Sequence, residues 1–212
     1  MSGGAGRTAV MGPADGGRDE RPAWREIALA PLAEVTEPTV DRLLAELSRR
    51  VLIPCRRVRC PTPPPLDTVP GRTQIDADRW LARLEAHAEP GVPLIGVAES
   101  DIALPIFTFV FGRARVGGHA AVVSLARLRP EYYGLAADPA QLARRAAAEL
   151  LHELGHVAGL AHCERADCLM RFAASVEAAD LRGFAFCPAC AGALPQGLVP
   201  RPHPFAAEAG AL

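Results

Sequence analysis

The sequence predicts a layered α/β or α+β fold. Short apolar runs typical of strands alternate with segments whose apolar residues recur at helical spacing, and the last helical segment is the longest. The 212 residues are enough for a substantial core. Half of the residues are hydrophobic and the formal net charge is −1, which is typical of a soluble globular chain.

The first half of the chain predicts two strands and two helices. A strand is expected at residues 27–32, followed by a helix at residues 38–50 in which Val40, Leu43 and Leu47 share one face. A second strand is expected at residues 51–58. Residues 61–70 (PTPPPLDTVP) predict a loop, because proline suits neither a helix interior nor a central strand. A helix over residues 76–88 follows.

Three further strands and a long helix are expected next. The strands are predicted at residues 93–98, 106–111 and 120–125. The helix is predicted from Pro139 to Ala158, because Asp138 is a favourable N-cap and proline suits the first helical position. Gly159 follows, where glycine permits the left-handed turn that ends a helix.

The two ends of the chain and its charge limit the possible partners. Residues 1–24 and 194–212 lack apolar periodicity and are predicted to be disordered tails around a domain at residues 25–193. The sequence contains no apolar run suited to a signal peptide or a membrane span. We therefore expect a cytoplasmic protein that binds neither membranes nor nucleic acid. Since disulfides rarely persist there, the six cysteines indicate metal binding or reactivity.

The end of the long helix carries the string HExxHxxGxxH. His152 and His156 lie one turn apart on the same helix face, where two imidazoles can share one zinc ion. A third ligand at His162 requires the chain to turn back, and Gly159 stands where that turn is needed. The full string would arise by chance in this composition with a probability on the order of 10⁻⁵.

Three histidines leave one coordination position of zinc open to water, as in catalytic sites. Glu153, the residue after His152, is placed to hold such a water and to act as a general base. These features predict a hydrolase that needs no nucleophilic side chain.

Four cysteines follow the third histidine. Their two close-spaced pairs suggest a closed tetrahedral zinc site, formed by Cys163, Cys168, Cys187 and Cys190. A redox C-x-x-C pair and four buried free cysteines are the alternatives. Cys55 and Cys60 share the spacing of the first pair, but free buried thiols explain them better.

The whole motif, His152-Glu153-x-x-His156-x-x-Gly159-x-x-His162-Cys163-x₄-Cys168-x-Met170 with a distant Cys187-x-x-Cys190, resembles the archaemetzincins. The resemblance implies a metzincin-type zinc peptidase with two zinc ions, a histidine-bound catalytic one and a cysteine-bound structural one. Glu153 would be the base, and Met170 would form the Met-turn below the histidines. No tyrosine follows Met170, so an oxyanion donor other than zinc is unassigned.

The resemblance extends upstream to Phe109-Val110-Phe111-Gly112, to Ser124-x-x-Arg127-Leu128 and to Arg72-x-Gln74. It implies a zincin-like, twisted, mixed five-stranded sheet with an antiparallel edge strand, packed on the active-site helix, and a small zinc-stabilised C-terminal subdomain. By this analogy, residues 106–111 would be the edge strand that pairs with substrate.

The leading hypothesis is thus a monomeric, cytoplasmic zinc metallopeptidase that acts on peptides or proteins. Two alternatives stay open: a non-enzymatic interaction module stabilised by zinc, and a zinc hydrolase of a non-peptide substrate. Glu153 discriminates between enzyme and module, because a structural site needs no unliganded carboxylate beside the metal.

Overall fold

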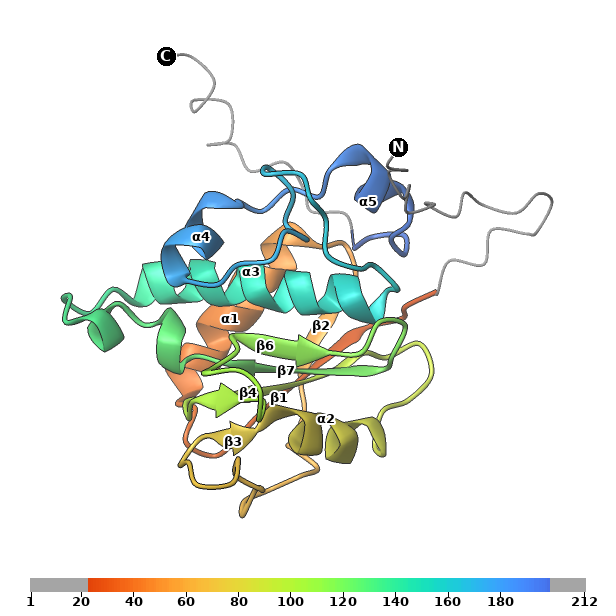
Figure 1. Cartoon of the computed structure of the whole chain (residues 1–212). Helices are drawn as coiled ribbons and strands as arrows, with labels where there is room; N and C mark the ends of the chain where they lie inside the picture. Colours follow the sequence, from red (N-terminus) through yellow and green to blue (C-terminus); the bar gives the residue numbers. More distant parts are fainter. Residues whose placement is uncertain (1–22, 199–212) are drawn as a thin grey trace, which may run out of the picture.

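A mixed five-stranded sheet lies at the centre of the computed structural model, which describes residues 23–198 (Figure 1). The strands run in the order β2-β1-β4-β7-β6. Their bounds are β1 Ile27–Pro31, β2 Cys55–Arg57, β4 Leu94–Ala98, β6 Gly112–Ala114 and β7 Ala120–Ser124. A small two-stranded sheet joins β3 (Ile75–Asp76) to β5 (Ile102–Ala103).

The sheet is parallel except at one edge. β1 pairs in parallel with β2 and β4, and β4 pairs in parallel with β7. β6 runs antiparallel to β7, with Arg113 opposite Val122. The predicted mixed sheet with an antiparallel edge is therefore confirmed.

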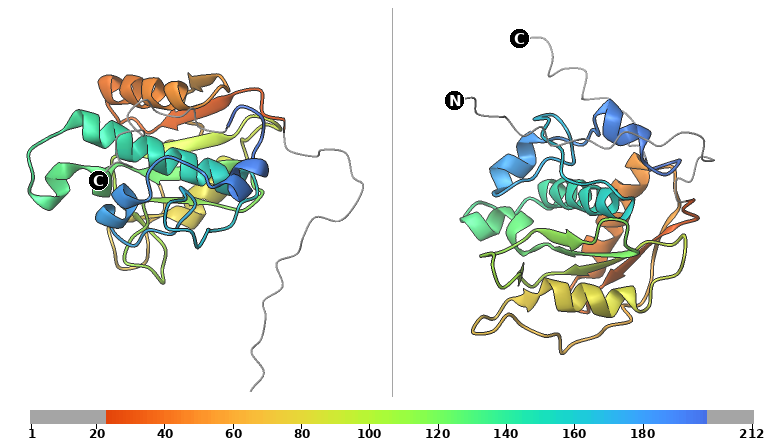
Figure 2. Two further views of the ribbon diagram at one scale, coloured as in Figure 1. Left: turned by 90° about the horizontal axis from the view of Figure 1, so that it is seen from above. Right: turned by 45° about the vertical axis from the view of Figure 1, so that its right-hand side comes forward.

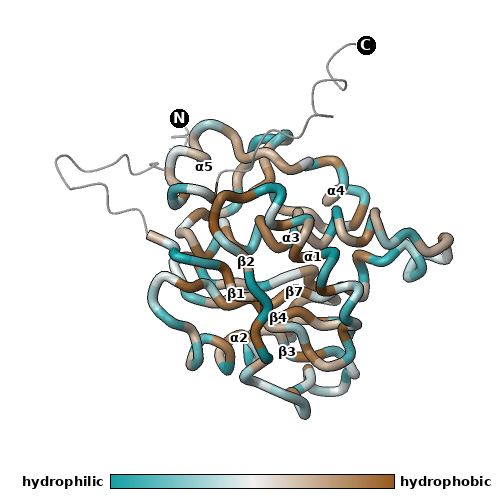
Figure 3. The backbone as a smooth tube through the Cα atoms, turned by 180° about the vertical axis from the view of Figure 1, so that it is seen from behind, coloured by the Kyte–Doolittle hydropathy of each residue, from teal (hydrophilic) through white to brown (hydrophobic). Residues whose placement is uncertain are grey.

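Helices cover both faces of the sheet. α1 (Glu37–Arg50) and α3 (Pro139–Val157) pack together on one face, and Figure 2 shows them side by side. α2 (Ala77–Glu85) packs on the other face against β4 and β7. Side chains alternate along a strand. In β1, β4 and β7, odd-numbered residues such as Ile95 therefore join the α1–α3 core, and even-numbered ones such as Val122 join the α2 core. Figure 3 shows the hydrophobic residues concentrated along β1, β4 and β7.

α3 begins at Pro139, as the sequence predicts, and ends at Val157, one residue before the predicted end. The Asp138 side chain accepts hydrogen bonds from the backbone N–H groups of Ala140 and Gln141. Gly159 has a φ of 100°, in the left-handed region, and turns the chain back toward the helix. Beyond it lie α4 (Val176–Leu181) and α5 (Pro188–Gly192), both above α3 in Figure 1. The sequence analysis missed both of these short helices.

The strand predicted at residues 106–111 is wrong. Residues 105–109 form a turn and loop, Val110 makes only an isolated bridge to Ile102, and the edge strand begins at Gly112. Side chains take the place of a ladder partner, because the carbonyls of Phe107 and Thr108 accept hydrogen bonds from Arg72 and Gln74.

The second predicted strand is much shorter than residues 51–58. Val51 ends α1 by donating its N–H to the Leu47 carbonyl. The N–H of Leu52 donates to the carbonyl of Gly197, which lies outside the sheet. Pro54 has no N–H to give to a ladder, so pairing starts at Cys55.

The packed chain extends past the predicted domain limits. Trp24 packs against the α1–α3 core, and Leu194 and Leu198 are almost completely buried in it. The remainder of the two predicted tails, residues 1–22 and 199–212, lies outside the described residues. None of the helices within residues 23–198 has the length and apolarity needed to cross a membrane.

Candidate metal centre and active-site cleft

The structure brings the three histidines of the motif together. His152 and His156 come from the last turns of α3, and His162 comes from the segment after Gly159. One ring nitrogen of each lies within 4.8 Å of the others, and the Nε2 atoms of His152 and His156 are 3.2 Å apart. Such close nitrogens match the donor set of a zinc ion.

Backbone carbonyls orient two of these rings. His152 Nδ1 donates to the carbonyl of Leu169 at 2.8 Å, and His156 Nδ1 donates to that of Leu160 at 2.7 Å. These bonds leave each Nε2 as the free acceptor, which is the atom a metal needs.

Burial keeps the imidazoles neutral. It lowers the pKa of His152 to about 4 and also lowers the pKa values of His156 and His162. Neutral imidazole is the form that ligates metals, so the group is ready for a cation at neutral pH.

Glu153 lies beside the histidines, and its carboxylate is only partly satisfied by hydrogen bonds within the described residues. The residue is 3% exposed, and its Oε2 atom has no hydrogen-bond partner among the described residues. Burial and the neighbouring Glu149 carboxylate raise its pKa well above the ordinary value. An orphaned buried carboxylate is costly and points to a missing polar partner such as a metal-associated water.

Gly112 gives Glu153 its space. A Cβ atom at this position of β6 would lie 2.6 Å from Oε1 and 2.7 Å from Cγ of Glu153. Only glycine lets the edge strand approach the carboxylate this closely.

A buried ion pair that the sequence analysis missed lies next to the site. Arg182, which ends α4, donates to Glu149 of α3 and to the carbonyl of Arg171, and its Nη1 lies 3.2 Å from His152 Nδ1. Burial alone would raise the pKa of Glu149, but the Arg182 guanidinium outweighs it and lowers the pKa. Glu149 lies on the buried face of α3, one turn before Glu153, and a glutamate at such a position is the only feature of the sequence that could indicate this ion pair.

Met170 packs against α3, the helix that carries His152 and His156. Its side chain is fully buried, and a Cβ added at Gly155 of α3 would lie 2.3 Å from its sulfur. The Met170 carbonyl accepts the N–H of Cys163, so the same turn also reaches the cysteines.

The four C-terminal cysteines form a second group. Cys163, Cys168, Cys187 and Cys190 each place a sulfur within 4.8 Å of the others. The backbone N–H of Cys190 chiefly lowers the pKa of Cys187, to about 7, which favours the thiolate that binds zinc. Four clustered thiols at one point fit a closed zinc site better than a single redox pair.

Cys55 and Cys60 take no part in either group. Both are half-buried, and each lies near a backbone carbonyl two residues away in sequence. Burial raises the pKa of Cys55 to about 11, so its thiol stays protonated.

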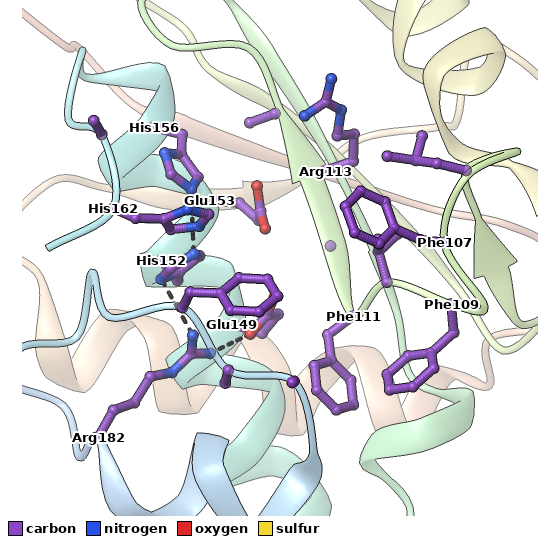
Figure 4. A pocket seen from close by; sticks show the side chains of 18 of the residues that line it. Phe107, Phe109, Phe111, Arg113, Glu149, His152, Glu153, His156, His162 and Arg182 are labelled. Atoms are coloured by element: carbon purple, nitrogen blue, oxygen red, sulfur yellow. Dashed lines mark hydrogen bonds and ion pairs between the residues drawn. The ribbon is translucent and has the colours of Figure 1, made fainter. Parts of the chain in front are cut away.

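The histidines open into a cleft of about 550 Å³ (Figure 4). One wall is the 107–114 segment, and Phe172, Ala173 and Ala174 contribute to the rest. Glu149 and Arg182 also line the cleft. Tyr132 and Tyr133 are not among the lining residues, and the Tyr133 hydroxyl donates to the carbonyl of Arg127.

Comparison with known proteins agrees with this architecture. The pattern of Peptidase family M54 matches residues 87–196, about half of the chain. The archaemetzincin of Methanocaldococcus jannaschii is 46% identical over 97 residues, which cover 46% of this chain and 54% of that protein. The chain thus spans about half the length of several curated relatives that it matches.

Solved structures match over most of the fold. An archaemetzincin from Archaeoglobus fulgidus, complexed with malonate, has a TM-score of 0.66 and 30% identity, covering 80% of this chain and 99% of that one. A zinc-dependent peptidase from Methanocorpusculum labreanum also has a TM-score of 0.66, with 27% identity, covering 79% and 98%. Because the family pattern spans both the histidine triad and the four cysteines, the chain belongs to Peptidase family M54, the archaemetzincins.

Proposed function

We propose that this chain hydrolyses peptide bonds at a zinc centre formed by His152, His156 and His162, with Glu153 as the general base. One observation carries the proposal. Three neutral imidazoles converge within 4.8 Å, and beside them in the same cleft lies a buried carboxylate, one oxygen of which has no hydrogen-bond partner among the described residues.

The residues fit zinc by their chemistry. Imidazole nitrogen is a preferred zinc ligand, and three such ligands are typical of catalytic rather than structural sites. Zinc supplies a Lewis acid there, which lowers the pKa of water to ~7 and polarises a carbonyl.

Glu153 has the position needed to move protons. Its carboxylate would take a proton from the attacking water and release it to the leaving amine. Gly112 and the backbone of β6 hold it on the strand side, and α3 holds it on the histidine side. Its burial excludes bulk water, which strengthens each electrostatic contact at the site.

The four cysteines would bind the second zinc ion as a structural site. Cys163 follows His162 directly, so this ion would also fix the position of the third histidine. It would clamp a segment whose helices, α4 and α5, have only six and five residues.

The antiparallel edge strand supports a peptide as substrate. β6 pairs with β7 on one side and lines the cleft on the other, where an extended peptide can add as a further strand.

The histidine group and the cysteine group are both formed by residues of this one chain, so a monomer suffices. Thiols arranged as metal ligands favour a reducing compartment such as the cytoplasm.

Digestion of a diverse peptide mixture, read by mass spectrometry, tests the proposal. Zinc-loaded wild type should produce cuts that a chelator abolishes. Glu153→Ala should produce none while it keeps its zinc. Glu34→Ala, which removes an exposed glutamate remote from the cleft, is the matched control and should cut like the wild type.

Each alternative has a distinct outcome. Cuts by Glu153→Ala at the wild-type rate would remove the general-base mechanism. If the folded, zinc-loaded wild type cleaves no peptide in the mixture, the result would favour the interaction module or a non-peptide substrate.

A further inference from the structure

We propose that Arg127 and Asp101 are positioning residues that hold an aromatic wall of the cleft, and that this wall binds a bulky apolar side chain of the substrate. The proposal rests on the proposed function, since it names a preference of the same cleft. It also gives a role to three sequence motifs that the metal sites do not use.

The aromatic wall is the loop at residues 105–111, whose residues from Phe107 onward line the cleft, and few backbone hydrogen bonds hold this loop. Side chains hold it instead. Arg72 Nη1 donates to the Phe107 carbonyl at 2.7 Å, and Gln74 Nε2 donates to the Thr108 carbonyl at 2.7 Å. The backbone of this loop reaches neighbouring strands through two residues at its end. The N–H of Val110 donates to the carbonyl of Ile102, and the carbonyl of Phe111 accepts the N–H of Ser124.

Asp101 connects one of these anchors, Gln74, to Arg127. Its Oδ2 atom accepts from Gln74 Nε2 at 2.9 Å and from Arg127 Nε and Nη2 at 2.9 and 2.8 Å. Its backbone carbonyl accepts the N–H of Ile75, next to Gln74. The Asp101 carboxylate thus fixes the side chains of Gln74 and Arg127 relative to each other.

Arg127, held by Asp101, packs on the first of the aromatic rings. Its guanidinium carbon lies 4.2 Å from the centre of the Phe109 ring, a cation–π distance. Phe109 in turn packs edge to face on Phe111, with ring centres 5.2 Å apart. Phe111 directly precedes Gly112, which contacts Glu153.

The surface so formed is apolar. Phe107 on the wall is 46% exposed, and Phe172 is 58% exposed and lies 5.3 Å, ring centre to ring centre, from His162. The two arginines that line the cleft have acidic partners, since Arg113 pairs with Asp78 and Arg182 pairs with Glu149. A bulky apolar side chain beside the histidines would cover these exposed rings.

The test separates positioning from general stability by comparing two hydroxamate probes. N-acetyl-phenylalanine hydroxamate carries a ring that can reach the wall, and acetohydroxamate carries only the group that binds the metal. Calorimetry would measure the affinity of both for zinc-loaded wild type, Arg127→Ala and Arg127→Lys. KM and kcat for an apolar peptide, with melting temperatures, would be measured in parallel.

Arg129→Ala is the matched control. Arg129 makes a similar two-point contact, with Glu99, through Nε at 2.8 Å and Nη2 at 2.5 Å. Unlike Arg127, it makes no cation–π contact with an aromatic ring of the described residues. Its loss should leave the affinity for both probes unchanged.

We expect wild type to favour the phenylalanine probe, and Arg127→Ala to weaken that probe by about tenfold, the scale of one well-placed aromatic contact, without changing acetohydroxamate binding. KM should rise more than kcat falls. Arg127→Lys keeps the positive charge but not the planar guanidinium that binds Asp101 at two points. It should recover part of the lost affinity for the phenylalanine probe. If Arg127→Ala does not fold, Asp101→Asn gives the same comparison.

Equal losses of both probes, or an Arg127→Ala profile like that of Arg129→Ala, would overturn the proposal. Selective binding without hydrolysis would support the wall while rejecting the peptidase. Hydrolysis without probe selectivity would reject the wall while supporting the peptidase.

Discussion

Glu153 lies between two elements that constrain it from opposite sides. α3 carries the residue on the same helix as His152 and His156, and β6 approaches it through Gly112. Its proton affinity follows from this placement, because burial and Glu149 both raise its pKa. A raised pKa makes this carboxylate a stronger proton acceptor than an ordinary glutamate.

Gly112→Ala should displace this carboxylate. The added Cβ would lie within 2.7 Å of Glu153 Cγ, so the side chain must move and not only its tip. We expect kcat to fall on the order of 10- to 100-fold, since a misplacement of about 1 Å at a reacting group has this effect. Peptide turnover measures the loss. Zinc content should stay at the wild-type value, and kcat within twofold of wild type would contradict the role given to Gly112.

The sequence predicts those residues of the metal centre that lie close together along the chain. The spacing of His152, His156 and Gly159 is a property of one helix and its end, so the sequence places them without tertiary information. Arg182 was not predictable in this way. It reaches Glu149 across 33 positions of sequence, and no periodicity of either segment indicates that the two meet.

At the scale of elements, the turn at Leu169 and Met170 packs closely on α3 at Gly155. Gly155 faces the Met170 sulfur and the ring of Phe186, so the turn that carries Leu169 packs directly on the helix. The Leu169 carbonyl orients His152 from this position. Close packing here therefore serves ligand geometry.

Gly155→Ala should destabilise the protein, although alanine favours a helix interior over glycine by ~1 kcal/mol. The new methyl group would overlap Met170 Sδ at 2.3 Å, and overpacking of this kind costs about 1–3 kcal/mol. Denaturant unfolding measures the difference in free energy. Gly192→Ala in α5, whose Cβ meets nothing within 4 Å, should show no loss. A gain in stability for Gly155→Ala would rule out the tight contact.

The elements show why strand prediction failed at one place. Phe107, Phe109 and Phe111 alternate as strand residues do, and alternation was the only local signal. Whether such a segment joins a sheet depends on its backbone partners, and here Arg72 and Gln74 satisfy its carbonyls first. The capped helix α3 had no such competitor, so its predicted start was correct and its end differed by one residue.

At the scale of the whole molecule, the C-terminal segment is held in two ways. Leu194 and Leu198 insert into the α1–α3 core, and the cysteine group ties α5 to the chain after His162. The predicted boundary at residue 194 was too early because these two leucines lie among Pro and Gly, without a helical or strand period to mark them.

Cys190→Ser should remove one of the two zinc ions expected per chain. The zinc content, measured by elemental analysis, should fall from two ions per chain to one. The rate of hydrogen exchange should rise in residues 163–198, since a structural zinc contributes folding free energy directly. Turnover should also fall, because His162 precedes Cys163. Cys55→Ser, at a half-buried thiol outside both groups, should keep both ions. A zinc content that Cys190→Ser leaves unchanged would contradict the two-site account.

The most direct test of the central claim is turnover per bound zinc in wild type and Glu153→Gln, with peptide cleavage and metal content measured on the same samples. The amide keeps the shape of the side chain but cannot accept the proton. We predict unchanged zinc and a fall in turnover of about 10²- to 10⁴-fold, the usual contribution of a general base. Turnover within a few-fold of wild type at equal zinc would contradict the mechanism.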